Sequence, residues 1–197
     1  LLLAVYGFVF GVVFQARWPD MAGGRGGGAG FAVVLFAGLI LHFFLAECLS
    51  RAPGLIAGNT NYVKPMVFPL EILPLSVVGA AAIQLAIAFA VLVMAALVIT
   101  GGVAWTVVLF PLVVAPLLVL AAGIVWLVSA IGVFLRDIGQ VVGIATTAML
   151  FVSPILFPLS QVPESLRTVI GLNPLTFVVA ASRDVVLWGR MPDPGAY

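Results

Sequence analysis

Long apolar runs separated by short polar segments set the pattern of this chain. The apolar runs are residues 1–14, 31–49, 71–99, 103–135 and 138–157. A helix that crosses a membrane needs about 20 apolar residues to match a hydrocarbon core about 30 Å thick. The last four runs meet or approach that length, and each predicts a spanning helix. The first run is too short, so we expect it to be the second half of a span that begins before Leu1.

The polar segments predict where these helices end. A flexible, glycine-rich loop is expected from Gln15 to Gly30, and a tight turn at Thr100–Gly102 follows the third run. The fourth run is longer than one perpendicular crossing requires. We therefore expect Pro111 and Pro116 to kink it, or its first turns to lie in the membrane interface near Trp105.

The last part of the chain follows a different pattern. Pro154, Pro158 and Pro163 break the helix, Asn173-Pro174 splits the next apolar stretch, and Arg183-Asp184 adds charge to it. Neither half is long enough to span. Such segments are tolerated at membrane depth where protein or a water-filled cavity covers them. We therefore expect a re-entrant or surface-lying pair of helices over residues 158–190.

Composition assigns the class of protein. Of the 197 residues, 64% are hydrophobic and 8% are charged, whereas soluble domains carry about 25% charged residues. The expected fold class is an all-α integral membrane protein: a polytopic helical bundle with five visible spans, a sixth missing, and a re-entrant helical pair. Residues 1–197 are expected to form one transmembrane domain that is truncated at both ends. The net charge of +1 offers no surface for nucleic acid.

Candidate chemistry is sparse. The single Cys48 is expected to be a packing residue, because one cysteine forms neither an internal disulfide nor a metal cluster. The glycine run Gly26–Gly28 lacks the following lysine and hydroxyl residue of a phosphate-binding loop, so we expect no ATP site here. The acidic residues are scattered, and His42 has no acid four residues on. A satisfied interior histidine is favoured over a proton relay, and no enzymatic activity is expected.

The hinge, residues 51–70, separates the second and third spans. A loop that only reverses the chain needs a few residues, whereas the hinge has roughly twenty. It mixes apolar side chains such as Ile56 and Tyr62 with polar ones such as Asn59 and Lys64. That mixture indicates a short amphipathic helix at the membrane interface, and a surface suited to docking a partner.

Three smaller features leave alternatives open. Arg136-Asp137 is either a helix end whose arginine reaches the lipid headgroups or a contact point on the water-facing side. Tyr6, Phe10 and Phe14 recur every four residues and form one aromatic stripe. Such stripes most often pack against lipid or other helices, and the sharper alternative is a channel wall on which sugars stack. Small residues in the spans are expected to allow close helix approach: Gly79–Ala82, Gly139 and Gly143.

Charge does not fix the orientation in the membrane. Basic residues on the side of the hinge are Arg51, Lys64 and Arg136, and those on the other side are Arg17, Arg25, Arg167, Arg183 and Arg190. Counting them would place the hinge outside the cell. The flank before the first span usually dominates that rule, however, and it is missing here.

Four motifs in the same order carry a resemblance to a known family. They are Asn61–Lys64 followed by Val67–Pro74, Phe134–Ile138, Ser153–Pro158 and Leu172–Leu175. Together they resemble the permease subunits of bacterial ABC exporters for polysaccharides and polyol phosphates. These are the membrane halves of O-antigen, capsule and teichoic-acid exporters. The resemblance covers nearly the whole chain.

The resemblance implies a six-helix, multi-pass permease of the bacterial inner membrane. It would pair with a second copy of itself and bind two copies of a separate ATPase subunit, which would hold ATP and Mg. No catalytic, cofactor or metal site is then expected in this chain. Residues 51–70 and Arg136-Asp137 would be cytoplasmic, and residues 158–190 periplasmic. The residues expected to couple to the ATPase are Asn59, Asn61, Tyr62, Lys64, Arg136 and Asp137.

The expected function is therefore ATP-driven export of a lipid-linked glycan across the inner membrane, with membrane lipid around the bundle. We expect Tyr6, Phe10 and Phe14 on the substrate pathway. Two alternatives remain at this point. One is an ABC permease for a drug or lipid cargo. The other is an ion-coupled secondary transporter, which would need a buried charge near mid-span, where His42 is the candidate.

Overall fold

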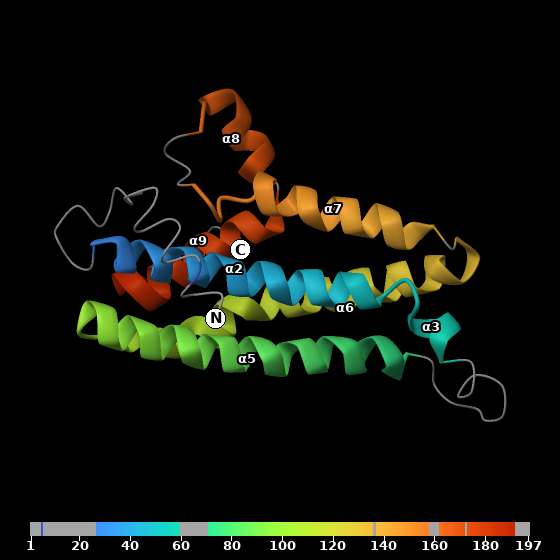
Figure 1. Cartoon of the computed structure of the whole chain (residues 1–197), viewed down its shortest axis with the longest axis horizontal. Helices are drawn as coiled ribbons and strands as arrows, with labels where there is room; N and C mark the ends of the chain where they lie inside the picture. The colour runs from blue at the N-terminus through green and yellow to red at the C-terminus, as the bar shows by residue number, and fades with distance from the viewer. Residues whose placement is uncertain are drawn as a thin grey trace.

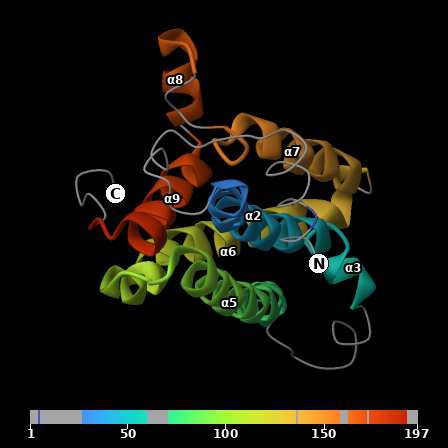
Figure 2. The same cartoon turned by 60° about the vertical axis from the view of Figure 1, so that its left-hand side comes forward.

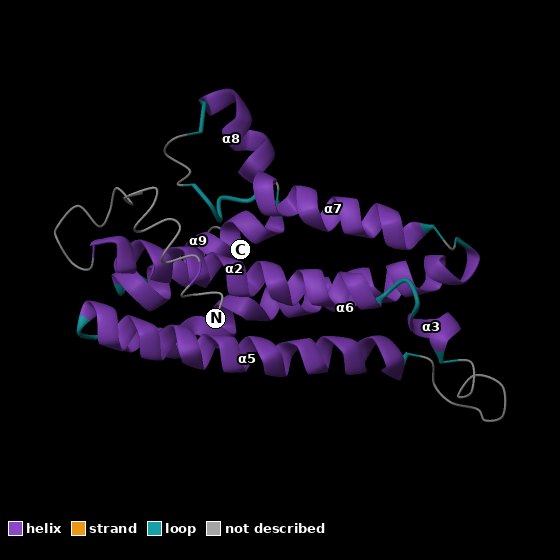
Figure 3. Ribbon diagram, in the orientation of Figure 1, coloured by secondary structure: helices purple, strands orange, loops and turns teal. Residues whose placement is uncertain are grey.

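The computed structural model describes residues 27–59, 71–135, 137–157, 162–171 and 173–191, together with Val5. These ranges contain helices and no strands (Figure 3). The helices are α2 (Gly27–Arg51), α3 (Leu55–Gly58), α5 (Ile72–Thr100), α6 (Phe110–Phe134), α7 (Ile138–Val152), α8 (Glu164–Gly171) and α9 (Pro174–Arg183). A 3₁₀ turn, η3 (Trp105–Leu109), precedes α6, and a π-helical turn, η5 (Asp184–Trp188), follows α9.

Helix α2 is the centre of the bundle. It lies between α5 and α7, and both views show this arrangement (Figures 1 and 2). Its side chains are buried nearly all round, including Val33, Leu35, Leu39 and Leu41, as expected for a helix that is apolar on every face. The helix begins at Gly27, so the loop predicted to run to Gly30 ends earlier.

Helices α5 and α6 are long enough to cross a membrane and expose much of their apolar surface. With α2 they are the helices in the described ranges whose length and composition suit a span. The outer face of α5 carries exposed aliphatic and thioether side chains: Ile83, Ile87, Val91, Met94 and Val98. The two helices pack through Phe89 and Phe110, whose rings are nearly parallel with centroids 3.8 Å apart. The outer face of α5 is therefore suited to lipid.

The fourth apolar run divides at its start. The turn predicted at Thr100–Gly102 is present, and Gly101 closes α5 in the left-handed region, with φ 76°. The 3₁₀ turn then carries an exposed Trp105 and leads directly into α6. That these first turns lie in the membrane interface stays a prediction. Pro111 lies in the first turn of α6, where its missing N–H costs nothing. Pro116 lies inside the helix.

Helix α7 is shorter than the fifth run predicts, and the end at Phe157 was wrong. The helix stops at Val152 because Ser153 is extended, with φ −86° and ψ 146°. A residue before proline is sterically disfavoured in the helical region, and Pro154 follows. Fifteen residues make a helix about 22 Å long. This is less than the thickness of the hydrocarbon core.

The expected helical pair in residues 158–190 is present as α8 and α9. Asn173 caps α9, since its Oδ1 accepts the Leu175 amide at 3.0 Å, and Pro174 occupies the first turn. Helix α9 packs against α2 and buries Leu175, Val178 and Val179. Helix α8 projects away from the bundle (Figure 1). The position of the pair relative to the membrane stays a prediction.

Candidate functional site

Five helix ends meet at one end of the bundle, which we call the coupling end. Helix α2 ends there, α3 follows it, α5 and α7 begin there, and α6 ends there (Figure 1, right-hand side). The stretch after α2 and the start of α7 therefore lie at the same end of the bundle, although they are far apart in the chain.

Pro53 is the central contact of the coupling end. A Cβ atom added at Gly132 in α6 would overlap the carbonyl oxygen of Pro53 and lie 2.9 Å from its carbonyl carbon. A Cβ atom at Gly139 in α7 would lie 3.8 Å from Pro53 Cβ. The backbone after α2 is thus seated directly on α6 and beside α7.

The predicted coupling residues fall partly within the described ranges. Asn59 is half-buried and donates through Nδ2 to the carbonyl of Leu55 at 2.7 Å, so it closes α3. Asp137 is exposed and precedes the first residue of α7, without a side-chain cap. The expected amphipathic helix is a single turn here, α3. The other predicted coupling residues lie outside the described residues: Asn61, Tyr62, Lys64 and Arg136.

One further contact joins two elements at the coupling end. Trp126 in α6 donates through Nε1 to the carbonyl of Glu71 at 3.2 Å, and this ties the start of α5 to α6. Glu47 and Arg51 form a solvent-accessible ion pair within the last turn of α2, which stays inside that helix. The hydrophobic pattern alone does not reveal either contact.

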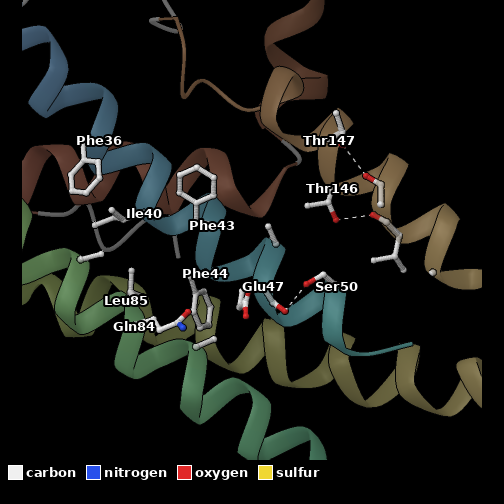
Figure 4. A pocket seen from close by; sticks show the side chains of 16 residues that line it. Phe36, Ile40, Phe43, Phe44, Glu47, Ser50, Gln84, Leu85, Thr146 and Thr147 are labelled. Carbon is white, nitrogen blue, oxygen red and sulfur yellow. Dashed lines mark hydrogen bonds between the residues drawn. The ribbon is translucent and has the colours of Figure 1, made fainter. Parts of the chain in front are cut away.

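A groove of about 590 Å³ lies between α2, α5 and α7 (Figure 4). Pockets of about 300–1,000 Å³ hold drug-sized ligands. Along α2 the groove runs from Phe36 to Ser50, so it reaches the coupling end. The side chains that give it chemical character are Phe36, Phe43, Phe44, Glu47, Ser50, Gln84, Thr146 and Thr147.

The groove is more polar than the lipid-facing side of α5. Its hydroxyl groups donate to their own helices: Thr146 to Val142 at 2.7 Å and Thr147 to Gly143 at 2.9 Å. The hydroxyl oxygens keep lone pairs that can accept hydrogen bonds. Gln84 is also exposed in the groove. Polar side chains in a span face protein or a water-filled path rather than lipid, so this side of the bundle is the candidate site.

The groove offers the two kinds of contact that carbohydrate needs. Phe43 is 38% exposed and lies along the groove (Figure 4), where an aromatic face can pack against the CH face of a sugar. Glu47, Gln84 and Thr147 carry hydrogen-bond acceptors or donors in the same groove. The expected pathway residues Tyr6, Phe10 and Phe14 lie outside the described residues.

Sequence reasoning missed the groove, although a signal was present. Gln84, Thr146 and Thr147 interrupt otherwise apolar runs, and two of them are adjacent in α7. The prediction that small residues allow close helix approach holds in part, since Ala81 is buried and a Cβ atom at Gly139 would lie 3.8 Å from Pro53 Cβ. A Cβ atom at Gly79 or Gly143 would meet no atom within 4 Å. The close approaches are instead at Gly132 and Gly38, because closeness depends on what lies opposite.

The remaining ionisable candidate, His42, differs from its prediction. Its side chain is buried, and Nδ1 has no hydrogen-bond partner among the described residues. Its ring lies 5.9 Å from that of Phe43 at a tilt of 58°. The expectation of a satisfied histidine therefore fails at Nδ1. Among the same residues, no three His, Cys, Asp or Glu side chains are placed to hold a metal ion.

Comparison with known proteins decides the family. Residues 1–187 match the family described as ABC-2 type transporter. The chain belongs to this family. It is 24% identical to the O-antigen export system permease protein RfbA of Klebsiella pneumoniae. The 193 aligned residues cover 97% of this chain and 70% of that protein. It is 26% identical to the protein of the same name from Myxococcus xanthus, over 98% of this chain and 71% of that protein.

A third relative of this ABC-2 permease carries a different name. The chain is 28% identical over 192 residues to the polysialic acid transport protein KpsM of Escherichia coli, over 94% of this chain and 69% of that protein. The family confirms the resemblance seen in the four sequence motifs. The chain is a multi-pass permease subunit of the bacterial inner membrane. An ABC-2 permease works with an ATP-binding partner subunit.

Proposed function

We propose that this ABC-2 permease is the membrane subunit of an exporter that moves lipid-linked polysaccharide outward at the expense of ATP. The observation that carries the proposal is similarity along 94–98% of the chain to permeases named for O-antigen export and polysialic acid transport. The chemistry of the groove supports it, because aromatic side chains of α2 line it together with the polar side chains Gln84, Thr146 and Thr147. A drug or lipid cargo would share the fold and is the alternative.

The groove is proposed as one wall of the glycan pathway. Phe43 would provide a stacking surface, while Gln84 and Thr147 would exchange hydrogen bonds with successive sugar hydroxyls. Weak, repeated contacts of this kind let a polymer slide without being held. The aromatic stripe Tyr6, Phe10 and Phe14 remains our second candidate for the pathway.

Coupling is proposed to begin at the hinge. Two ATPase subunits would bind a pair of permeases, and closure of the ATPases on ATP would push on Tyr62, Lys64 and their neighbours. ATP and Mg would be held by the partner subunits. The seating of Pro53 on Gly132 supports the route, because it links the hinge to α6 through backbone contact. Asn59, Asn61, Arg136 and Asp137 are proposed to share this docking surface.

The proposal is tested by glycan-stimulated ATP hydrolysis. The full-length permease and its ATPase would be purified together in lipid nanodiscs and given lipid-linked O-antigen or capsule oligosaccharides, with the same lipid carrier without sugar as control. We expect ATP hydrolysis to rise with the glycan and not with the bare carrier. Equal stimulation by the bare carrier or by hydrophobic drugs would favour the alternative cargo. Transport that persists without the ATPase and follows an ion gradient would favour a secondary transporter.

A further inference from the structure

Arg183, the last residue of α9, is a buried arginine whose guanidinium donates to three carbonyl groups on two other segments. Its side chain is 4% exposed. Nε donates to the carbonyl of Val34 in α2 at 3.1 Å, Nη1 to Pro154 at 2.8 Å and Nη2 to Ile155 at 2.9 Å. We call residues 153–157, which follow α7, the α7 turn. One side chain thus joins α9 both to α2 and to this turn.

The α7 turn needs a strong donor at this place. Helix α7 starts at the coupling end and stops well short of the far end of α5 (Figure 1), so its last carbonyls and those of the turn lie partway along a candidate membrane span. Carbonyl groups there must be satisfied by protein, because lipid offers no donor. Pro154 and Ile155 are buried. A guanidinium carries five N–H donors in a rigid fork, which suits two neighbouring carbonyls and a third on another helix.

Gly38 makes room for this contact. A Cβ atom added there would lie 3.0 Å from Arg183 Nη2, 3.2 Å from Ile155 Cγ2 and 3.3 Å from Val179 Cγ1. Helix α2, helix α9 and the α7 turn therefore approach one another most closely around this glycine. An alanine at position 38 would press on the guanidinium while leaving the arginine in the chain.

A second contact fixes the same turn to the other end of α9. Asn173 donates through Nδ2 to Ser153 Oγ at 2.8 Å. The side chain of a helical residue leans toward the N-terminus of its own helix, so Arg183 reaches back along α9 toward this contact. The turn is held at both ends of α9. Helix α8 packs against α9 and projects from it.

We propose that Arg183 is a positioning residue for export: it ties the far end of α7 to α9, so that movement of α7 is transmitted to the α8–α9 pair. The first residues of α7 lie at the coupling end beside Pro53, and its last residues lie in the Arg183 contact. Helix α7 is thereby a direct link between the two regions. The inference rests on the proposed function in one respect, that ATP binding by the partner moves α7. It requires no particular cargo.

The test compares hydrogen exchange in the full permease–ATPase complex, with and without a non-hydrolysable ATP analogue and without glycan. In the wild type we expect the analogue to change exchange in peptides covering residues 138–152 and residues 164–183. In Arg183→Met we expect the change to persist in the first range and to be lost in the second. An unchanged response in residues 164–183 of Arg183→Met would overturn the proposal. A wild type without a response in either range would overturn it as well.

Three variants separate positioning from simple stability. Arg190→Met is the matched control, because Arg190 is exposed and does not contact the α7 turn in the described structure; it should respond like the wild type. Gly38→Ala should weaken the response in residues 164–183 with the arginine present. Arg183→Lys keeps the charge but presents a compact ammonium, so we expect a partial response.

Measurements of complex assembly and of glycan export separate a positioning role of Arg183 from a structural one. If Arg183→Met fails to assemble with the ATPase, Gly38→Ala and Arg183→Lys carry the test: a reduced response in residues 164–183 supports the proposal, and a wild-type response in both variants overturns it. A variant that assembles normally, hydrolyses ATP and loses both export and the response in residues 164–183 supports positioning. A variant that loses export in proportion to the amount of complex formed, with its response intact, would show a structural role and contradict the proposal. Because no glycan is present in the exchange experiment, its result is independent of the cargo assigned above.

Discussion

Asn173 and Ser153 are joined by a hydrogen bond of 2.8 Å from Nδ2 to Oγ, across 20 positions in the chain. The two residues belong to two of the four motifs that first pointed to the family. Asn173 has a second role, because its Oδ1 accepts the Leu175 amide and caps α9. One side chain thus starts the helix and attaches it to the end of α7.

Replacing Asn173 should separate these two roles. Asn173→Ala removes both contacts, and we expect it to lower the free energy of unfolding by about 1–3 kcal/mol, since a lost N-cap costs about 0.5–2 kcal/mol and a lost hydrogen bond about 1 kcal/mol. Asn173→Ser keeps a capping oxygen but is too short to reach Ser153, so it should lose less. Thermal unfolding of the purified permease measures both. Equal stability of the two variants and the wild type would contradict the assigned contacts.

Replacing either of two glycines of α6 by alanine should have opposite effects on the stability of the protein. In Gly132→Ala the new methyl group meets the backbone of Pro53, and overpacking against backbone costs about 1–3 kcal/mol. We also expect weaker binding of the ATPase partner, because the displaced segment belongs to the coupling end. Gly123→Ala is the control: its Cβ atom meets nothing within 4 Å, and alanine favours helix by about 1 kcal/mol over glycine. Copurification of the partner and the unfolding temperature distinguish the two.

A large side chain introduced into the groove should block export while the helical bundle stays folded. Gly143 lines the groove and has open space around it, so Gly143→Trp should fit but narrow the path. We expect a loss of export of tenfold or more, equivalent to about 1.4 kcal/mol, at normal complex formation. Val91→Trp, on the exposed face of α5, should export normally. Full activity of Gly143→Trp would remove the groove from the proposed pathway.

Removing the candidate docking side chains of the hinge should uncouple ATP hydrolysis from glycan export. Changing Tyr62 and Lys64 together to alanine should leave the permease folded while glycan no longer stimulates ATP hydrolysis. Lys64→Arg, which keeps the positive charge, serves as the control and should retain most stimulation. Stimulation at the wild-type level in the double variant would exclude these two residues from coupling.

The aromatic stripe makes a separate prediction. Changing Tyr6, Phe10 and Phe14 together to alanine should slow glycan export if the stripe lines the pathway, because the stacking surface is removed. Export assayed at matched amounts of complex measures this. Unchanged export would place the stripe against lipid or other helices.

The sequence predicted the spans well where length and apolar content decide the structure. Helix α5 matches its predicted run within one residue at each end, because Gly101 and the charged Glu71 limit it. It overestimated α7, since hydrophobicity continues past Val152 while backbone sterics at Ser153-Pro154 end the helix. Local chemistry thus outweighed the apolar pattern.

The site was less predictable because it depends on what lies opposite each residue. Arg183 stood out in the sequence only as a charge in an apolar tail, and its partners are backbone carbonyls far away in the chain. Gly38 and Gly132 matter because other backbones approach them. Neither the Arg183 contacts nor the close approaches at these glycines can be recognised from the order of residues in the chain. Thr146 and Thr147 of α7 do stand out as polar residues in an apolar run, but only the packing shows that they face a groove shared with α2 and α5.

The central claim, ATP-driven movement of a lipid-linked glycan through this permease, is tested most directly by transport into sealed proteoliposomes. The full-length permease and its ATPase would be reconstituted with a fluorescent lipid-linked glycan, and the glycan that crosses the bilayer would be measured as the fraction protected from an added glycosidase or sugar-binding quencher. The account predicts that this fraction changes with ATP and Mg and does not change with a non-hydrolysable analogue. The same fraction with and without ATP, for every glycan in a complex that hydrolyses ATP, would contradict it.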